Sequence, residues 1–354
     1  MGLKKIQDRF LGGIKLKIMR EFQLIEKIFK PLTKGCDAAQ CLADDAAKIS
    51  LKKNEELVIS KDVMVENVHF LSDDGGFKIA SKLLRVNLSD LAASGATPLY
   101  YMLGFSKTKD CDEKFLREFA RGLKSVQDEF DLCLIGGDTV RSQEKFFSVT
   151  IFGKVKKWQI LSRNQAKEGD LIFVSGTIGD AFIGFTKACE SMKYFSQRHF
   201  FPTPRIELGK QLLAKKLSKC AIDISDGLLA DLRHICHASK LDAEVFLTKI
   251  PFSIHAQKIL KQVQDGGRVC SHPELVSGSK FTTLDLLSHG DDYELIFAVN
   301  PKNRKKILHL AKSLKLDLTC IGEFKKSTQK KFEVVLRNEK NQKIKIKKFG
   351  YEHF

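Results

Sequence analysis

The chain has 354 residues, 43% of them hydrophobic and 29% charged, which is typical of a folded globular protein long enough for two domains. It carries 60 lysines and arginines against 43 aspartates and glutamates, and the resulting net charge of +17 can attract nucleic acid, an anionic membrane or a phosphorylated small molecule. The lysines are scattered, without an arginine-rich stripe or an RNA-binding motif, and no apolar run is long enough for a membrane helix, so we expect no nucleic acid and no membrane as a partner.

The first half of the chain alternates helices and strands. After a helix at 20–30, the pattern predicts a strand at 57–62, a helix from 77 to a Gly95 cap, a strand at 98–106, a helix at 112–130 and strands at 132–135 and 146–155. On the second of these helices Asn87, Asp90 and Ser94 form a polar stripe, which is usually a solvent face. We expect a first domain at 19–155.

The stretch at 134–139 joins an apolar run to two glycines, followed by Asp138 and Thr139. The apolar residues predict a buried strand, the glycines a turn, and Asp138 a carboxylate held at the end of the strand. Metals and phosphates are often bound at such places. Taken alone, however, an ordinary turn is the commoner explanation.

The second half is predicted to span 156–354. We expect strands at 171–175 and 220–224, a helix that begins at Thr203, and another helix after the acidic turn at 223–227. Free N–H groups at that helix start can bind phosphate beside a metal, whereas an ordinary acidic helix cap is the commoner alternative. His234 and His237 on this helix are interpreted as surface or packing histidines.

The last part contains an irregular segment at 262–280, which we interpret as a surface insertion. An acidic loop at 290–294 follows and enters a strand. Next come a helix at 302–314 and strands at 318–321, 332–336 and 344–346.

Two further features bear on the compartment. The 9 cysteines form no CxxC pair, which favours free thiols in a reducing cytoplasm over disulfides or a zinc site. Residues 1–18 are basic but lack the apolar core and cleavage site of a secretory signal. We interpret them as an extension, or a misassigned start before Met19, with no catalytic part, and expect a cytoplasmic protein.

Several acids fall at predicted strand ends or turns. They are Asp45, Asp62, Asp90, Asp138, Asp223, Asp226 and Asp291. If several converge on one cleft, they repel one another unless cations neutralise them, and oxygen-only ligands select Mg²⁺. Because the chain has neither GxxxxGK[ST] nor GxGxxG, these acids predict a nucleotide-phosphate site of another kind.

In order along the chain, several motifs resemble the thiamine-monophosphate kinase family, of the superfamily that includes aminoimidazole ribonucleotide synthetase and selenophosphate synthetase. The matching stretches are 44–47, 60–62 with 68–70, 86–96, 134–139, Arg163, 221–228, 290–295 and 350–354. The resemblance implies an α/β (α+β) fold of two domains, with an N-terminal sheet domain that dimerises and a C-terminal α/β domain. It also implies ATP-dependent phosphorylation of thiamine monophosphate to thiamine diphosphate, the last step of thiamine diphosphate biosynthesis.

The resemblance further implies roles for individual residues. Positions matching the family's Mg²⁺ ligands are Asp45, Ser60, Lys61, Asp62, Asp90, Asp138, Asp223 and Asp226. Positions matching its ATP contacts are Gly137, Asp138, Arg163 and Ser225, of which Asp138 and Arg163 are expected to be catalytic. Positions matching its substrate contacts are His69, Asp291 and one tail aromatic, Phe349 or Tyr351.

Four positions depart from the family pattern. Ala43 replaces a glycine, Lys61 replaces a threonine, so that only its backbone carbonyl can bind a metal, and Asp291 replaces a glutamate next to His289 where the family has glycine. None removes a carboxylate from the predicted metal site. The alternatives are a superfamily enzyme with another acceptor, or a basic, non-catalytic binding protein that has kept the fold.

Overall fold

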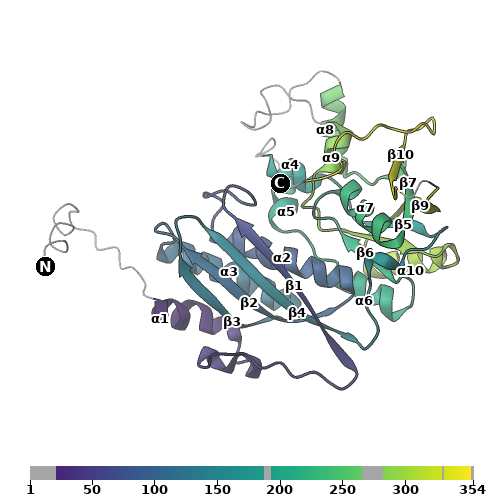
Figure 1. Ribbon diagram of the computed structural model, residues 1–354. Coiled ribbons are helices and arrows are strands. Elements are labelled where there is room, and N and C mark those ends of the chain that lie inside the picture. Colours follow the sequence, from purple (N-terminus) through teal and green to yellow (C-terminus); the bar gives the residue numbers. More distant parts are fainter. Residues whose placement is uncertain (1–20, 187–192, 265–281, 329–330, 352–354) are drawn as a thin grey trace, which may run out of the picture.

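The computed structural model describes residues 21–186, 193–264, 282–328 and 331–351. The predicted extension at 1–18 and most of the predicted insertion at 262–280 lie outside these ranges. Within them the chain forms two sheets with helices packed on them, so the expected α/β architecture is confirmed (Figure 1). Among the helices in these ranges, none is both long and apolar enough to cross a membrane.

The first sheet has four strands in the order β1-β4-β2-β3. They are β1 Glu55–Val65, β4 Phe146–Lys156, β2 Thr97–Lys107 and β3 Cys133–Arg141. All neighbours are antiparallel except the parallel pair β2 and β3. Helices α2 (Gly76–Ser94) and α3 (Glu113–Phe130) cover one face (Figure 1). Before β1 lie the short elements α1 Glu21–Leu24, η1 Ile25–Phe29, η2 Lys30–Thr33 and η3 Asp37–Leu42.

The second sheet has six strands in the order β10-β7-β9-β5-β8-β6, antiparallel apart from the pair β10 and β7. They are β10 Val334–Arg337, β7 Leu241–Phe246, β9 Leu318–Lys326, β5 Leu171–Ser175, β8 Leu295–Val299 and β6 Cys220–Asp223. The α-helices of this half are α4 Asp180–Phe185, α5 Lys193–Phe200, α6 Ile206–Ala214, α7 Leu228–Ser239, α8 Ile254–Gln264, α9 Thr283–Ser288 and α10 Arg304–Leu314. Its 3-10 turns are η4 Arg163–Gln165, η5 Leu247–Lys249 and η6 Pro301–Asn303.

Helix α2 is the element shared by both halves. Its apolar side chains pack on β1 and β4, and the same helix contacts β6 and α6 of the second half. It ends at Gly95, whose left-handed φ of 71° confirms the predicted cap. Gly209 of α6 packs so closely that a Cβ there would lie 2.0 Å from the Ala92 carbonyl oxygen, which only glycine allows.

The polar stripe of α2 is not a solvent face, so that expectation is wrong. Asn87 is fully buried, donates to the Leu83 carbonyl at 2.8 Å and accepts the Asp62 backbone N–H at 3.1 Å. A buried amide must satisfy its hydrogen bonds within the protein, and this one does so by joining α2 to β1.

The glycines of the 134–139 stretch do not form a turn either. Strand β3 continues through them to Arg141, and Gly137 pairs with Leu103 of β2. A Cβ on Gly137 would lie 2.0 Å from the Leu103 carbonyl oxygen, so glycine is needed for close strand approach. Asp138 therefore sits within a strand, not at its end.

Two other expectations are wrong in detail. Helix α6 begins at Ile206, because Arg205 has a non-helical ψ of 46° while its guanidinium is bound to Glu294. Residues 344–346 form no strand: a single bridge joins Arg337 to Lys343, and the two isoleucines of the segment pack against the second core.

Replacing Gly137 with alanine tests the close approach of β3 to β2. Because the new Cβ meets backbone, the strands must move apart, and we expect Gly137→Ala to lower the free energy of unfolding by roughly 1–3 kcal/mol. In Gly136→Ala the Cβ would meet only the flexible Met102 side chain, at 3.1 Å. Urea unfolding of both variants would show equal losses if the close approach were unimportant.

Candidate active site

A cluster of three carboxylates lies at the junction of the two halves. Asp62 is on β1, Asp90 on the last turns of α2, and Asp223 at the end of β6. Ser60 faces the same side of β1 as Asp62 and donates its hydroxyl to Asp90 Oδ2 at 2.5 Å. The structure thus brings four of the predicted metal-binding residues together.

Burial and mutual repulsion shift the pKa values of this cluster. Burial, reinforced by the negative charges of Asp90 and Asp223, raises the pKa of Asp62 to about 8. Burial, reinforced by Asp90, raises the pKa of Asp223 to about 7, and burial also raises the pKa of Asp90. The guanidinium of Arg163 opposes the shifts of Asp90 and Asp223, so this predicted catalytic residue also faces the cluster.

The residues after Asp223 continue along the site, but they do not offer free N–H groups to an anion. The backbone N–H groups of Ser225, Asp226 and Gly227 all donate to Asp231 Oδ2, at 3.0 to 3.1 Å. The acidic helix cap is therefore the correct alternative, with Asp231 in the first turn of α7 as the acceptor. A phosphate at this corner would depend on side chains.

A cavity of about 360 Å³ opens beside the cluster, with walls from both halves of the chain. Among its lining residues are Asp62, His69, Ser225, Asp226, Asp291 and Tyr351. The structure therefore brings the predicted substrate residues His69 and Asp291 into one cavity with part of the acidic cluster. Lys61 also lines the cavity, although its side chain is exposed.

Of the two tail aromatics, the structure places Tyr351 at the cavity. Its backbone N–H donates to the Asp226 carbonyl at 3.0 Å, which ties the tail to the site. Phe349 packs against the second core, with the Arg233 guanidinium 5.1 Å from its ring centroid. Of the two expected alternatives, Tyr351 is therefore the one that lines the cavity, and Phe349 does not.

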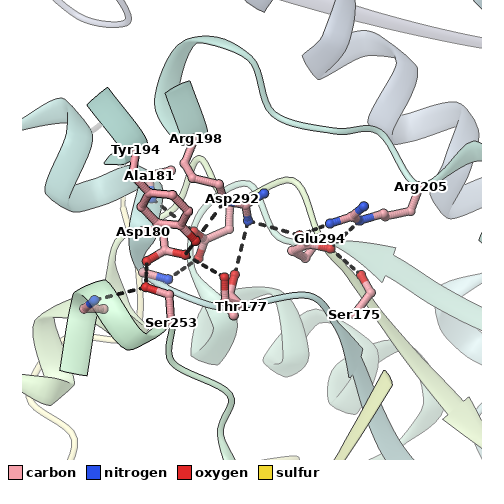
Figure 2. Close-up of polar contacts among 12 residues, drawn as sticks. Ser175, Thr177, Asp180, Ala181, Tyr194, Arg198, Arg205, Ser253, Asp292 and Glu294 are labelled. Carbon is pink, nitrogen blue, oxygen red and sulfur yellow. Dashed lines mark hydrogen bonds and ion pairs between the residues drawn. The ribbon is translucent and has the colours of Figure 1, made fainter. Parts of the chain in front are cut away.

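Successive side chains of the acidic loop at 290–294 point alternately to opposite sides of the loop. Asp292 and Glu294 are buried on one side, where Asp292 accepts the Gly179 N–H at 2.7 Å, and Glu294 binds Arg198 at 3.0 Å and Arg205 at 2.6 Å (Figure 2). Although burial would raise the pKa of Glu294, the two arginines lower it below its usual value. Asp291 and Tyr293 line the cavity instead.

Three predicted site residues lie elsewhere. Asp45 is exposed in the loop after η3, and Gly137 and Asp138 are on β3, at the opposite edge of the sheet from β1. The register aligns Asp62, Val149, Leu103 and Gly137 across four strands, so β3 lies roughly 14 Å from β1. The alternation of side chains places Asp138 on the outer face of the sheet, away from α2.

Sequence reasoning missed the partners that fix the site. Lys82 and His199 contact Asp291, and Arg198 and Arg205 anchor Glu294. Lys82 could have been predicted from the sequence. Lys82, Val86 and Asp90 are spaced four residues apart, so they lie on one face of α2. His234, interpreted as an ordinary histidine, has a ring nitrogen within 4.8 Å of carboxylate oxygens of Asp226 and Asp231.

The donor chemistry of the cluster fits Mg²⁺. Its ligand atoms are carboxylate and hydroxyl oxygens, which hard divalent cations prefer, and Asp62 and Asp90 lie partly buried beside the buried Asp223. A divalent cation would favour the ionised carboxylates and so oppose the burial and repulsion that raise the pKa values of Asp62 and Asp223.

Comparisons with known proteins bear on this site. Residues 43–155 match the family described as AIR synthase related protein, N-terminal domain, and residues 167–335 match the C-terminal domain of the same family. The chain is 35% identical over 344 residues to a thiamine-monophosphate kinase of Haemophilus influenzae, covering 95% of this chain and 98% of that relative. It is 38% identical over 309 residues to one of Caulobacter vibrioides, covering 86% and 84%.

Solved structures give the same result. The thiamine-monophosphate kinase of Stenotrophomonas maltophilia superposes with a TM-score of 0.75 at 35% identity, over 90% of this chain and 96% of that one. AaThiL in complex with AMPPCP and TMP superposes with a TM-score of 0.70 at 26% identity, over 97% and 100%. The hydrogenase maturation protein HypE, at 16% identity and a TM-score of 0.73, shares the fold.

The raised pKa values predict how stability depends on pH in the metal-free protein. A carboxyl group with a folded pKa near 8 and an ordinary unfolded pKa of 3.8 binds more protons in the folded state between those values, so stability falls as pH rises from about 4 to about 8. Adding Mg²⁺ should then raise the melting temperature more at pH 8 than at pH 5. Thermal unfolding across this range measures both effects.

Asp62→Asn should flatten this profile. Asp128→Asn is a control, because Lys124 and Lys34 lower the pKa of this exposed acid and its titration falls below the window. If the slope in Asp62→Asn equalled that of the wild type, the pH dependence would not originate in the acidic cluster.

Proposed function

The chain belongs to the thiamine-monophosphate kinase family, and we propose that it transfers the γ-phosphoryl group of ATP to the phosphate of thiamine monophosphate, giving thiamine diphosphate and ADP. This reaction is the last step of thiamine diphosphate biosynthesis. The observation that carries the proposal is the cluster of Asp62, Asp90 and Asp223, partly or fully buried beside a cavity that both halves of the chain line. A binding protein without turnover has no need of three acids that repel one another.

We propose Mg²⁺ as the cation of this site. Ser60, Asp62, Asp90 and Asp223 would hold it, with Asp226 and the Lys61 carbonyl beside them, and when bound it would neutralise phosphate oxygens and carboxylates together. Oxygen donors alone, with no thiolate in the cluster, support this choice over Zn²⁺.

The protein's own residues contribute alignment and charge. The acceptor is already an anionic phosphate oxygen, so it attacks the γ-phosphorus without a strong general base, and the bond to the β-phosphate oxygen breaks as ADP leaves. The guanidinium of Arg163 is exposed beside Asp90 and Asp223. It could stabilise the negative charge of the transferred phosphoryl group. Ser225 would contact ATP, while His69, Asp291 and Tyr351 would bind the acceptor in the cavity.

We also propose a homodimer formed through the outer face of the first sheet. That face carries exposed apolar side chains, which are Leu57, Ile59, Val63, Val140 and Phe146. An exposed apolar patch of this kind is typical of a protein–protein interface. Asp138 lies on the same face. Dimerisation would therefore place Asp138, and the neighbouring loop with Asp45, at the subunit interface, where both could contribute to an active site.

The remaining assignments are proposals of the same kind. We propose domains at 19–155 and 156–354, and a cytoplasmic location. The cysteines in the described part of the chain are all unpaired, which suits a reducing compartment.

The assay is incubation of the protein with ATP, Mg²⁺ and thiamine monophosphate, followed by chromatography of thiamine diphosphate. We expect Asp223→Asn and Asp138→Asn to lower kcat by at least about 100-fold, because each removes charge needed in the transition state. Asp138 is exposed, so its variant should keep the wild-type melting temperature. Near wild-type turnover in Asp138→Asn would remove that residue from the site, and absence of product from the wild type would point to another acceptor.

Dimerisation has a separate test. Ile59 is 56% exposed on the proposed interface, and Ile59→Asp should dissociate the dimer, since a buried unpaired charge costs several kcal/mol. Leu308→Asp, on the exposed face of α10, is the matched control and should leave the dimer intact. Sedimentation velocity distinguishes these outcomes, and a monomeric wild type would reject the interface.

A further inference from the structure

Helix α2 carries a lysine that is buried beside the cavity. The Lys82 side chain is 2% exposed, and its Nζ lies 2.7 Å from Asp291 Oδ2. A buried ammonium group is costly unless it is paired, so this ion pair explains how the lysine is accommodated. The pair also crosses between the two halves, because α2 belongs to the first and the acidic loop to the second.

Both oxygens of the Asp291 carboxylate are held by donors. Lys82 contacts Oδ2, and the Tyr293 hydroxyl donates to Oδ1 at 3.1 Å. The Nδ1 atom of His199 lies 3.4 Å from Oδ2, and its Nε2 lies 3.3 Å from Lys82 Nζ. Burial and the charge of Lys82 lower the pKa of His199 to about 3, so the ring is neutral.

The backbone of the loop is fixed from its other side. Asp291 and Tyr293 have left-handed φ values of 69° and 50°, which residues other than glycine rarely adopt. Between and after them, Asp292 and Glu294 are anchored in the buried network of Figure 2. Since the loop cannot adjust, the direction of the Asp291 carboxylate depends on the donors that face it.

The spacing on α2 relates this ion pair to the acidic cluster. Lys82, Val86 and Asp90 lie on one face of the helix, at intervals of four residues. Asp90 belongs to the cluster, Val86 lines the cavity, and Lys82 holds Asp291 at the other end, about 12 Å along the helix axis. One rigid helix therefore sets the distance between the phosphate-binding end and the Asp291 end.

We propose that Lys82 is a positioning residue for the phosphate acceptor: it fixes the Asp291 carboxylate toward the cationic ring portion of thiamine monophosphate, while the acidic cluster receives the phosphate end. The proposal rests on the proposed function. The Asp291 side chain is 29% exposed, so its carboxylate is accessible from the cavity while its direction is set from behind. An anion at this end complements a cationic ring system.

The test compares affinities for the two substrates in Lys82→Met, which keeps the length of the side chain and removes its charge. Calorimetry gives Kd for thiamine monophosphate and for the ATP analogue AMPPCP, and turnover is measured in parallel. We expect Kd and KM for thiamine monophosphate to rise on the order of tenfold, and the values for the nucleotide to stay within about twofold. In an Asp291→Asn background, Lys82→Met should add less than about twofold, because its effect passes through that carboxylate.

Lys145→Met is the matched control. Lys145 is equally buried and is paired with Glu66 and Asp110, but it does not line the cavity. It should lower the melting temperature without changing the ratio of the two affinities. Should Lys82→Met fail to fold, Lys82→Gln, which keeps a donor, is measured in the same way.

The outcomes are separable. Equal weakening of both substrates, an unchanged affinity for the acceptor, or additive effects in the double variant would overturn the role of Lys82. A wild type that binds thiamine monophosphate without turnover would reject the proposed reaction but leave the affinity test of Lys82 in force. A wild type that does not bind thiamine monophosphate would overturn both.

Discussion

Mutual repulsion among three clustered carboxylates, one buried and two partly buried, is the constraint on which the rest of the site depends. Asp62, Asp90 and Asp223 come from different elements, and folding alone must force them together. Burial removes the water that would screen their charges, so the apolar packing of α2 against both sheets must supply the free energy that holds them. The acidic cluster therefore lowers the stability of the metal-free protein. A cation that binds only the folded state would raise that stability.

The buried acid Glu294 behaves in the opposite way. Glu294 is as deeply buried as Asp223, yet two arginines and the Ser175 hydroxyl surround it and keep it ionised. Glu294 and Asp223 therefore differ in their partners rather than in their burial. The carboxylate of Glu294 is neutralised by two arginines of the protein itself, whereas those of Asp62 and Asp223 would be neutralised by a bound metal ion.

Much of this is accessible from the sequence, because ordered motifs identify the family and hydrophobic periodicity places most helices and strands. The errors have physical causes. Gly136 and Gly137 favour a turn because glycine permits turns, but it equally permits two strands to approach closely. A solvent face is expected at Asn87 because periodicity cannot show that β1 covers this part of the polar side of α2. The pairing of Lys82 with Asp291 spans 209 residues, and local patterns carry no information about such contacts.

The glycine contact between α2 and α6 limits how far one helix can slide along the other. Shear between two helices needs side chains at their interface that can change rotamer as they slide, and at Ala92 and Gly209 backbone meets backbone instead. The connector is tied there as well, since Leu161 donates its N–H to the Ser94 carbonyl. Together the two contacts fix the C-terminal end of α2 to the second half of the chain through backbone atoms, which cannot change rotamer to let the helices slide.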